Sequence, residues 1–158
     1  MSDDTKAFWD RMAGVNAGML GVRDDTRLVP MSHYADPATK SLWFITAQGT
    51  DLVSDVEGGA KDAQYVIASG SDGIYALVNG QLSLSTDAAK LDEIWNAVAS
   101  SWFEDGKRDP DIRLLQLAIA DTEVWATSKS SIAFLYQIAK AKLTGEKPDM
   151  GEHFSLTL

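Results

Sequence analysis

Closely spaced turn signals divide the middle of this chain into short apolar segments. Residues 64–69 and 74–78 are joined through a loop that ends in Asp72-Gly73, and Asn79-Gly80 leads on to residues 81–84. Asp-Gly and Asn-Gly are strong hairpin signals, because these residues tolerate a positive φ. The spacing therefore predicts three consecutive antiparallel strands, which restricts this part of the chain to a sheet built from hairpins.

Further strands and helices are expected on both sides of this region. The other expected strands are residues 17–22, 28–34, 41–46, 112–120 and 123–126, with a turn at Asp121-Thr122 before the last one. The expected helices are residues 3–14, 51–57, 87–103 and 131–143. Pro30 cannot donate to a ladder, so its strand is expected to be irregular or to lie at a sheet edge. Because hairpins dominate and no regular βαβ alternation is present, the pattern predicts an α+β fold with an antiparallel sheet or barrel and flanking helices.

The helix expected over residues 87–103 has the clearest apolar stripe. Its members are Leu91, Ile94, Trp95, Val98 and Trp102. They recur at the spacing of one helix face. With 158 residues, 45% of them hydrophobic, the chain is long enough for one ordinary domain with a real core. We expect that single domain over residues 1–145 and a C-terminal tail over residues 146–158.

Charge and composition exclude several classes of function. The formal charge of −9 repels a polyanion, and no basic run is interleaved with aromatics, so nucleic-acid binding is not expected. The absence of cysteine excludes disulfides, thiolate metal sites and a cysteine nucleophile. No apolar run approaches the roughly 20 residues of a membrane span. The N-terminal segment is acidic and has no apolar signal core, so the cytoplasm is the expected location.

Catalytic patterns are sparse. The two histidines, His33 and His153, do not belong to a cluster with metal-ligand spacing, so no metal site is expected. Neither a G-x-S-x-G turn nor a nucleotide-binding glycine motif is present. The paired acids Asp24-Asp25 and Asp109/Asp111 lie beside turn residues and are expected in solvated loops. No catalytic residue is assigned, and a Ser/His hydrolase would need contacts that the sequence does not show.

A series of short marks runs along most of the chain. They are Phe8-Trp9-Asp10, residues 17–22, Pro30-Met31, residues 42–46 (Leu-Trp-Phe-Ile-Thr), residues 94–96, residues 102–106, Asp109-Pro110-Asp111 and Trp125. Their order and spacing resemble the pyridoxamine 5′-phosphate oxidase-like family, in its general stress protein 26 branch. The resemblance implies an FMN-binding split barrel that forms a homodimer, with FMN in two clefts at the dimer interface.

The same resemblance indicates where a flavin would be bound. The ring would lie against strand backbone and aromatics of both subunits, and the phosphate near the Arg-Pro-Met strand and the loop after the Phe-x-Thr strand. The candidate cofactor-binding residues are Val29, Pro30, Met31, Ile45, Thr46, Thr50, Asp51, Leu52, Trp102 and Trp125.

Two of these positions depart from the family pattern. Val29 stands where the family has arginine, and Thr50-Asp51-Leu52 stands where it has Ser-x-Lys. An FMN phosphate carries about −1.5 to −2 charge. Hydrogen bonds to charged groups contribute roughly 1.5–3 kcal/mol each, so losing two would weaken binding by roughly 3–6 kcal/mol if nothing compensates. Compensating cations could come from Arg27, or from Arg23, Lys40 and Lys129, although solvated surface positions are the simpler interpretation.

Two functions remain open at this point. The first is a flavin-binding protein of the general stress type, which could serve as an FMN-dependent oxidoreductase of a small substrate. The alternative is a non-catalytic module of the same fold that has lost tight FMN binding and holds another ligand or acts as a dimeric interaction protein. Oxidation of pyridoxamine phosphate itself is not expected, because residues 146–158 offer only Lys147 and His153 for a substrate phosphate.

Overall fold

The computed structural model describes residues 1–25, 27–127, 131–145 and 151–158. The helices are α1 (Asp3–Gly14), α2 (Asp51–Val56), α3 (Ala88–Ile94), α4 (Ala97–Trp102) and α5 (Ser131–Thr144), with a 3-10 turn, η1, at Gly106–Arg108. The strands are β1 (Gly18–Val22), β2 (Val29–Met31), β3 (Tyr34–Asp36), β4 (Ser41–Ala47), β5 (Lys61–Ser69), β6 (Ile74–Ser85), β7 (Ile112–Ala126) and β8 (Glu152–Thr157).

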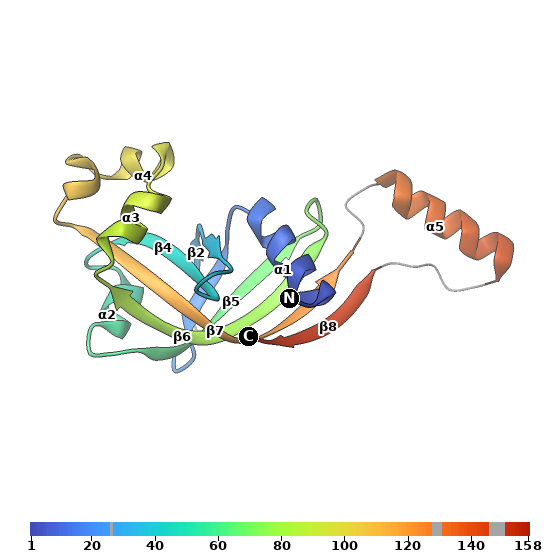
Figure 1. The fold of residues 1–158 in the computed structure, drawn as a ribbon, viewed down its shortest axis with the longest axis horizontal. Coiled ribbons are helices and arrows are strands. Elements are labelled where there is room, and N and C mark those ends of the chain that lie inside the picture. Colours follow the sequence, from blue (N-terminus) through green and yellow to red (C-terminus); the bar gives the residue numbers. More distant parts are fainter. Residues whose placement is uncertain (26, 128–130, 146–150) are drawn as a thin grey trace.

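One curved antiparallel sheet organises the described residues. Its strand order is β2-β1-β5-β6-β7-β4-β3, and β8 pairs with β7 as well. The first half of β7 pairs with β4 and its second half with β8. In Figure 1, the long strands β6 and β7 curve across the molecule, with α2, α3 and α4 at one end and α5 beyond the other. This confirms the predicted α+β split-barrel sheet with flanking helices.

The core lies inside the curve of the sheet, and α1 covers part of it. Ser2 caps α1 by accepting a hydrogen bond from the Thr5 amide, and acidic residues occupy the first turn. The inner face of α1 buries Phe8 and Met12 completely, in the same cluster as Phe44 and Tyr65. Full burial of an apolar side chain of this size contributes about 1.5–3 kcal/mol to stability.

Two predicted strand breaks are wrong. Asn79-Gly80 is not a turn but part of the continuous strand β6, at the point where the register with β7 shifts past Ala120. A Cβ on Gly80 would lie 2.1 Å from the Ala118 carbonyl oxygen, so the close approach of the strands requires glycine. Asp121-Thr122 does not interrupt β7, because the Thr122 hydroxyl donates to the Leu77 carbonyl (3.0 Å) and the Asn79 amide donates to Asp121 (2.8 Å). These polar side chains bond across the sheet instead of forming turns.

The single helix predicted over residues 87–103 is also wrong. α3 ends at Ile94, Trp95 is extended (φ −64°, ψ 132°), and α4 starts again at residue 97. The Asn96 side chain accepts from the Ala99 amide at 2.9 Å and so caps α4. Asparagine favours this role over a helix interior, which explains why the apolar stripe does not continue in one helix.

Two further differences concern the ends of the sheet. The tail predicted over residues 146–158 contains β8, which pairs with β7 from Ala126↔Glu152 to Asp121↔Thr157, and Leu156 is buried in the core. The strand predicted over residues 28–34 is divided into β2 and β3. Pro30 lies in β2 at the sheet edge, as predicted from its missing amide hydrogen.

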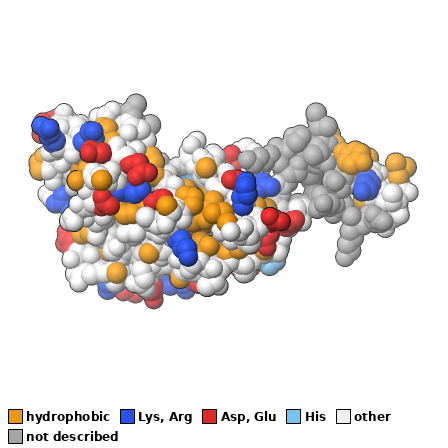
Figure 2. All heavy atoms as spheres, viewed as in Figure 1, with side chains coloured by type: hydrophobic (Ala, Val, Ile, Leu, Met, Phe, Trp, Pro, Cys, Tyr) orange, Lys and Arg blue, Asp and Glu red, His pale blue; other side chains and the backbone are white. Residues whose placement is uncertain are grey.

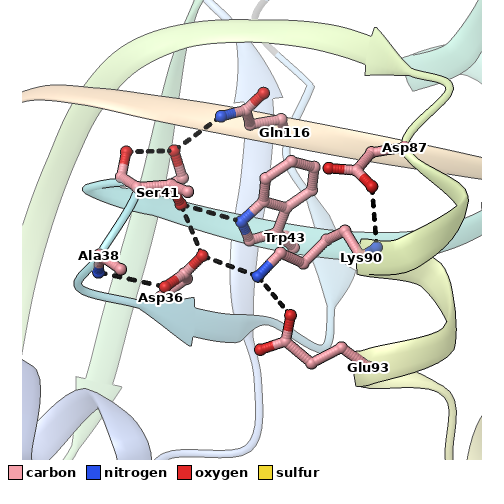
Figure 3. A network of polar contacts seen from close by, with 9 residues as sticks. Asp36, Ala38, Ser41, Trp43, Asp87, Lys90, Glu93 and Gln116 are labelled. Atoms are coloured by element: carbon pink, nitrogen blue, oxygen red, sulfur yellow. Dashed lines mark hydrogen bonds and ion pairs between the residues drawn. The ribbon is translucent and has the colours of Figure 1, made fainter.

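A buried lysine ties α3 to the β3–β4 hairpin (Figure 3). Lys90 Nζ lies 2.8 Å from Asp36 Oδ2, 2.7 Å from Glu93 Oε2 and 5.4 Å from the centroid of the Trp43 ring. Only 10% of the Lys90 side chain and 16% of the Asp36 side chain are exposed. Burial by itself raises the pKa of Asp36, but the hydrogen bonds from Lys90 and Thr39 outweigh it and hold that pKa below its ordinary value.

A buried histidine joins α1 to the linker between β2 and β3. His33 Nε2 lies 3.0 Å from the Met12 carbonyl oxygen, and because a carbonyl only accepts, Nε2 donates. Nδ1 lies 2.7 Å from the Tyr65 hydroxyl, which is also 2.9 Å from the Met31 carbonyl oxygen. Burial lowers the pKa of His33, with the Met12 carbonyl opposing that shift, so the folded protein favours the neutral ring.

We expect Lys90→Met to lower the free energy of unfolding by about 3 kcal/mol, because it leaves the Asp36 carboxylate unpaired in a mostly buried site. The matched control is Lys6→Met, which removes an exposed ion pair to Asp10 and should leave stability nearly unchanged. Denaturant unfolding at neutral pH measures both. Equal losses in the two variants would contradict a stabilising role for the Lys90 network.

We expect the stability of the protein to fall as the pH drops below about 6.5, the ordinary pKa of histidine, toward the lowered pKa of His33. In that range the unfolded chain binds a proton that the folded protein does not, so each pH unit costs up to about 1.4 kcal/mol. Urea unfolding from pH 7.5 to 5 should show a shallower slope for His33→Gln. An unchanged slope in His33→Gln would refute the assignment.

Candidate functional site

A cleft of about 380 Å³ opens between the β2 edge, the end of β4 and α4. Its lining residues are Pro30, Met31, Ser32, Tyr34, Ile45, Thr46, Ala47, Thr50, Ala99, Trp102 and Phe103. The volume is within the range of about 300–1,000 Å³ that is usual for small-molecule sites. The cleft is the candidate ligand site because it combines apolar walls, aromatic side chains and a few hydroxyls.

Local structure sets the shape of each wall. Pro30 and Met31 belong to the short edge strand β2, and Ile45 and Thr46 to the end of β4. Thr50 stands directly before α2, and its hydroxyl donates to the Ala47 carbonyl at 3.1 Å. The wall opposite these residues comes from α4, whose separate start at Asn96 positions Ala99 and Trp102.

The rim of the cleft carries an exposed tryptophan. Trp102, at the end of α4, leaves 79% of its surface exposed, whereas Phe103 beside it is buried. The Phe103 ring packs against Trp95 at a centroid distance of 6.1 Å. An exposed indole next to an apolar cleft is suited to covering a flat ligand.

The structure brings together six of the ten predicted site residues. They are Pro30, Met31, Ile45, Thr46, Thr50 and Trp102. Val29 and Leu52 do not line the cleft: Leu52 is 5% exposed in the core, and Val29 is partly buried against the same cluster. Asp51 is exposed and paired with Arg27.

Trp125 lies away from the cleft lining of its own chain. It is near the C-terminal end of β7, where β8 pairs, and its ring stacks on His153 with centroids 4.9 Å apart and planes 4° apart. His153 Nε2 is 2.8 Å from Glu123 Oε1. A role for Trp125 in ligand binding therefore depends on a second copy of the chain.

Sequence reasoning missed four of the lining residues. They are Ser32, Tyr34, Ala47 and Ala99, whereas Phe103 was considered with Trp102 and Trp125 as a possible contact of a ligand or a second subunit. Tyr34 follows the Pro30-Met31 mark by three residues, and its hydroxyl accepts a hydrogen bond from the Asn96 side chain. Ala99 could have been found from Asn96. An asparagine in the middle of an apolar helical stripe indicates the cap of a new helix, and Ala99 lies in the first turn of that helix.

The cleft itself is uncharged, and acidic residues lie near one end of it. Among the described residues that line it, none is Asp, Glu, Lys, Arg or His. Asp51 follows Thr50 directly, and Asp55 lies one turn further along α2. Burial raises the pKa of Asp55, and the charges of Asp25, Asp24 and Asp51 raise it further. Several carboxylates thus share the surface where α2 begins.

Cations that could hold an anion near the cleft already have other partners. Arg27 pairs with Asp51, and Arg23 donates to the Asn79 side chain. Arg113 lies opposite Thr46 in the sheet, but it donates to the Pro110 and Ile112 carbonyls, both at 2.8 Å, and to the Gln48 side chain. Lys40 does not line the cleft, and Lys129 lies outside the described residues.

The residues that line the cleft fit the ring of FMN but not its phosphate. Apolar walls and the aromatic side chains of Tyr34, Trp102 and Phe103 suit an uncharged planar ring. A phosphate would find the Thr50 hydroxyl but no lining cation. In the part of the chain that the structure describes, no group of three His, Asp or Glu side chains could hold a metal ion, and no helix is long and apolar enough to cross a membrane.

Comparisons with known proteins agree with this geometry. The family model described as pyridoxamine 5′-phosphate oxidase like matches residues 3–149. A crystal structure described as a general stress protein 26 from Jannaschia sp. CCS1 is 46% identical, with each chain covered completely and a TM-score of 0.94. No curated protein sequence matches this chain significantly.

More distant structures carry names that refer to flavins. The general stress FMN/FAD binding protein from Xanthomonas citri is 26% identical over 82% of this chain and 93% of its own, with a TM-score of 0.72. The FAD binding protein from Mycobacterium smegmatis, at 18% identity and a TM-score of 0.54, shares the fold over 78% of this chain and 93% of its own. Because the family model spans nearly the whole sequence and a structural relative aligns along all of it, this protein belongs to the pyridoxamine 5′-phosphate oxidase-like family.

Proposed function

We propose that this protein binds a flavin, with the isoalloxazine ring in the cleft between β2, β4 and α4. The observation that carries the proposal is an uncharged cleft of about 380 Å³ with Tyr34, Trp102 and Phe103 in its lining. Relatives with the same fold are named as FMN/FAD or FAD binding proteins, and others as general stress proteins. In this proposal the ring contacts five of the predicted candidates, which are Pro30, Met31, Ile45, Thr46 and Thr50.

The phosphate end of FMN is held more weakly here than in a relative with both cations. Leu52 belongs to the core and Val29 packs against it, so neither offers a charge to the ligand. Affinity then depends on burial of the ring, which is uncharged and large.

The active form we propose is a homodimer in which a second copy completes each cleft. Trp102 is 79% exposed, and Met19 and Tyr75 on the sheet are 38% and 41% exposed. Figure 2 shows hydrophobic side chains at the surface in the middle of the viewed face. Exposed large apolar side chains support a protein–protein interface. In such a dimer, the partner subunit's Trp125 is the candidate for contact with the ring.

The proposal extends to catalysis: the protein would act as an FMN-dependent oxidoreductase of a small substrate. A bound flavin would supply the redox chemistry, and this chain would supply position and exclusion of water. The described side chains of the lining offer the hydroxyls of Ser32, Tyr34, Thr46 and Thr50 and the indole N–H of Trp102 for hydrogen bonds to a substrate. A substrate phosphate has no lining cation, which argues against oxidation of pyridoxamine phosphate.

The alternative is a binding module that does not use FMN. It is favoured by the same loss of cations at Val29 and Leu52, and its cleft would hold another uncharged ligand. Flavin titration separates the two functions directly.

We expect the purified protein to quench the fluorescence of added FMN and to bind it in the micromolar range, more weakly than a relative that has the arginine and the lysine. Trp102→Ala should weaken binding about tenfold, because an aromatic contact of this kind contributes about 1–1.5 kcal/mol. Tyr136→Ala, which removes a ring that is 63% exposed on α5, is the matched control. Light scattering of each variant reports whether the dimer persists.

Absence of any response at high micromolar FMN or riboflavin would eliminate the flavin proposal in favour of the alternative. A monomeric protein that binds flavin fully would eliminate the proposed role of the second copy. If Trp102→Ala and Tyr136→Ala reduced FMN affinity equally, the proposal that the ring binds in this cleft would be wrong.

A further inference from the structure

We infer that this cleft selects for the uncharged part of a flavin and against a phosphate, so that dephosphorylated flavin of the riboflavin class binds at least as tightly as FMN. This inference rests on the proposed function and deepens it by naming the preferred ligand class. It follows from three features. Val29 and Leu52 replace the arginine and lysine of the family pattern, the surface beside the cleft carries carboxylates, and neighbouring cations already have hydrogen-bond or ion-pair partners.

Leu52 belongs to the hydrophobic core and Val29 packs against it. Leu52 lies on the inner face of α2 with Val53 and Val56, and all three are at most 5% exposed. Val29 packs against the same cluster from β2. These side chains stabilise the contact of α2 with the sheet, so neither position presents a charge to the cleft.

The surface next to these positions is acidic. Asp51 directly follows the lining residue Thr50, and its carboxylate, with those of Asp24 and Asp25, raises the pKa of Asp55. Burial is the largest cause of that shift, but the three carboxylates add to it in the same direction. A dianionic group that leaves the cleft beside Thr50 therefore meets negative charge where anion binding would need positive charge.

Three cations of the neighbouring segments, Arg27, Lys61 and Arg113, already have partners. Arg27 pairs with Asp51, which neutralises one charge with the other, and Lys61 is 3.6 Å from Asp24. Arg113 has the best position of the remaining cations, opposite Thr46, yet its guanidinium donates to two backbone carbonyls and to Gln48. Binding a phosphate there would break bonds that hold the loop after η1.

The test is a pair of titrations with riboflavin and FMN, followed by flavin fluorescence and by calorimetry, at 50 and 300 mM salt. We expect riboflavin to bind as tightly as FMN or up to about fivefold more tightly. Added salt screens repulsion, so FMN binding should tighten with salt while riboflavin binding stays constant. FMN binding that is tenfold tighter than riboflavin binding, or that weakens with salt, would overturn the inference while leaving flavin binding intact. If neither riboflavin nor FMN gave a binding signal, both the proposed function and this inference would be wrong.

Two pairs of variants test the cause. Asp51→Asn should tighten FMN binding two- to threefold, because it removes a carboxylate and frees Arg27. Asp10→Asn, at an equally exposed acid on α1, is the control, and neither change should alter riboflavin binding. Val29→Arg should tighten FMN binding tenfold or more through a charge-assisted bond, whereas Val29→Met should not. Equal effects of Val29→Arg on both ligands would overturn the electrostatic explanation, and so would no effect of Asp51→Asn on FMN.

Discussion

The pairing of β6 with β7 is the interaction on which the rest of the structure depends. It runs from Ile74↔Ala126 to Ser85↔Leu114, and every other strand is attached to one of these two directly or through a neighbour. β5, β1 and β2 extend the sheet from β6, whereas β4 and β3 extend it from β7. Because the sheet curves, these two extensions face each other, and the cleft lies where β2 and β4 approach. The site is thus a product of sheet curvature.

The bulge at Ala120 of β7, opposite Asn79-Gly80, illustrates how local sequence sets that curvature. A bulge bends the strand that contains it and increases its twist. Any side chain at Gly80 would collide with the backbone of β7, so the shift in register and the close approach of the strands depend on this one glycine. The same Asn-Gly pair that predicts a turn in isolation therefore continues a strand opposite a bulge when the flanking segments are long enough to pair on both sides.

The general architecture could be predicted from the sequence, and particular boundaries could not. Alternating apolar segments, the Asp72-Gly73 turn and the position of Pro30 lead correctly to an antiparallel sheet with β2 at its edge. Local patterns could not reveal that Asn79 and Asp121 bond across β6 and β7, since the partners are far apart in sequence. β8 was missed for the same reason: its stability comes from pairing with β7 and from the burial of Leu156, not from any strong local propensity.

The candidate site was predicted in part, and the division has a physical meaning. Residues on strands at the barrel mouth, such as Met31 and Thr46, line the cleft as predicted. Val29 and Leu52, where the family has its arginine and lysine, do not line it, because an aliphatic side chain such as that of Leu52 is stabilised by burial in the core.

This replacement couples stability to ligand choice. An inward-facing leucine strengthens the contact of α2 with the sheet, and in doing so removes a charge that an anionic ligand would need. Among related complexes, differences in affinity appear mostly in the dissociation rate. A flavin held by its ring alone would therefore leave faster than one also held by its phosphate.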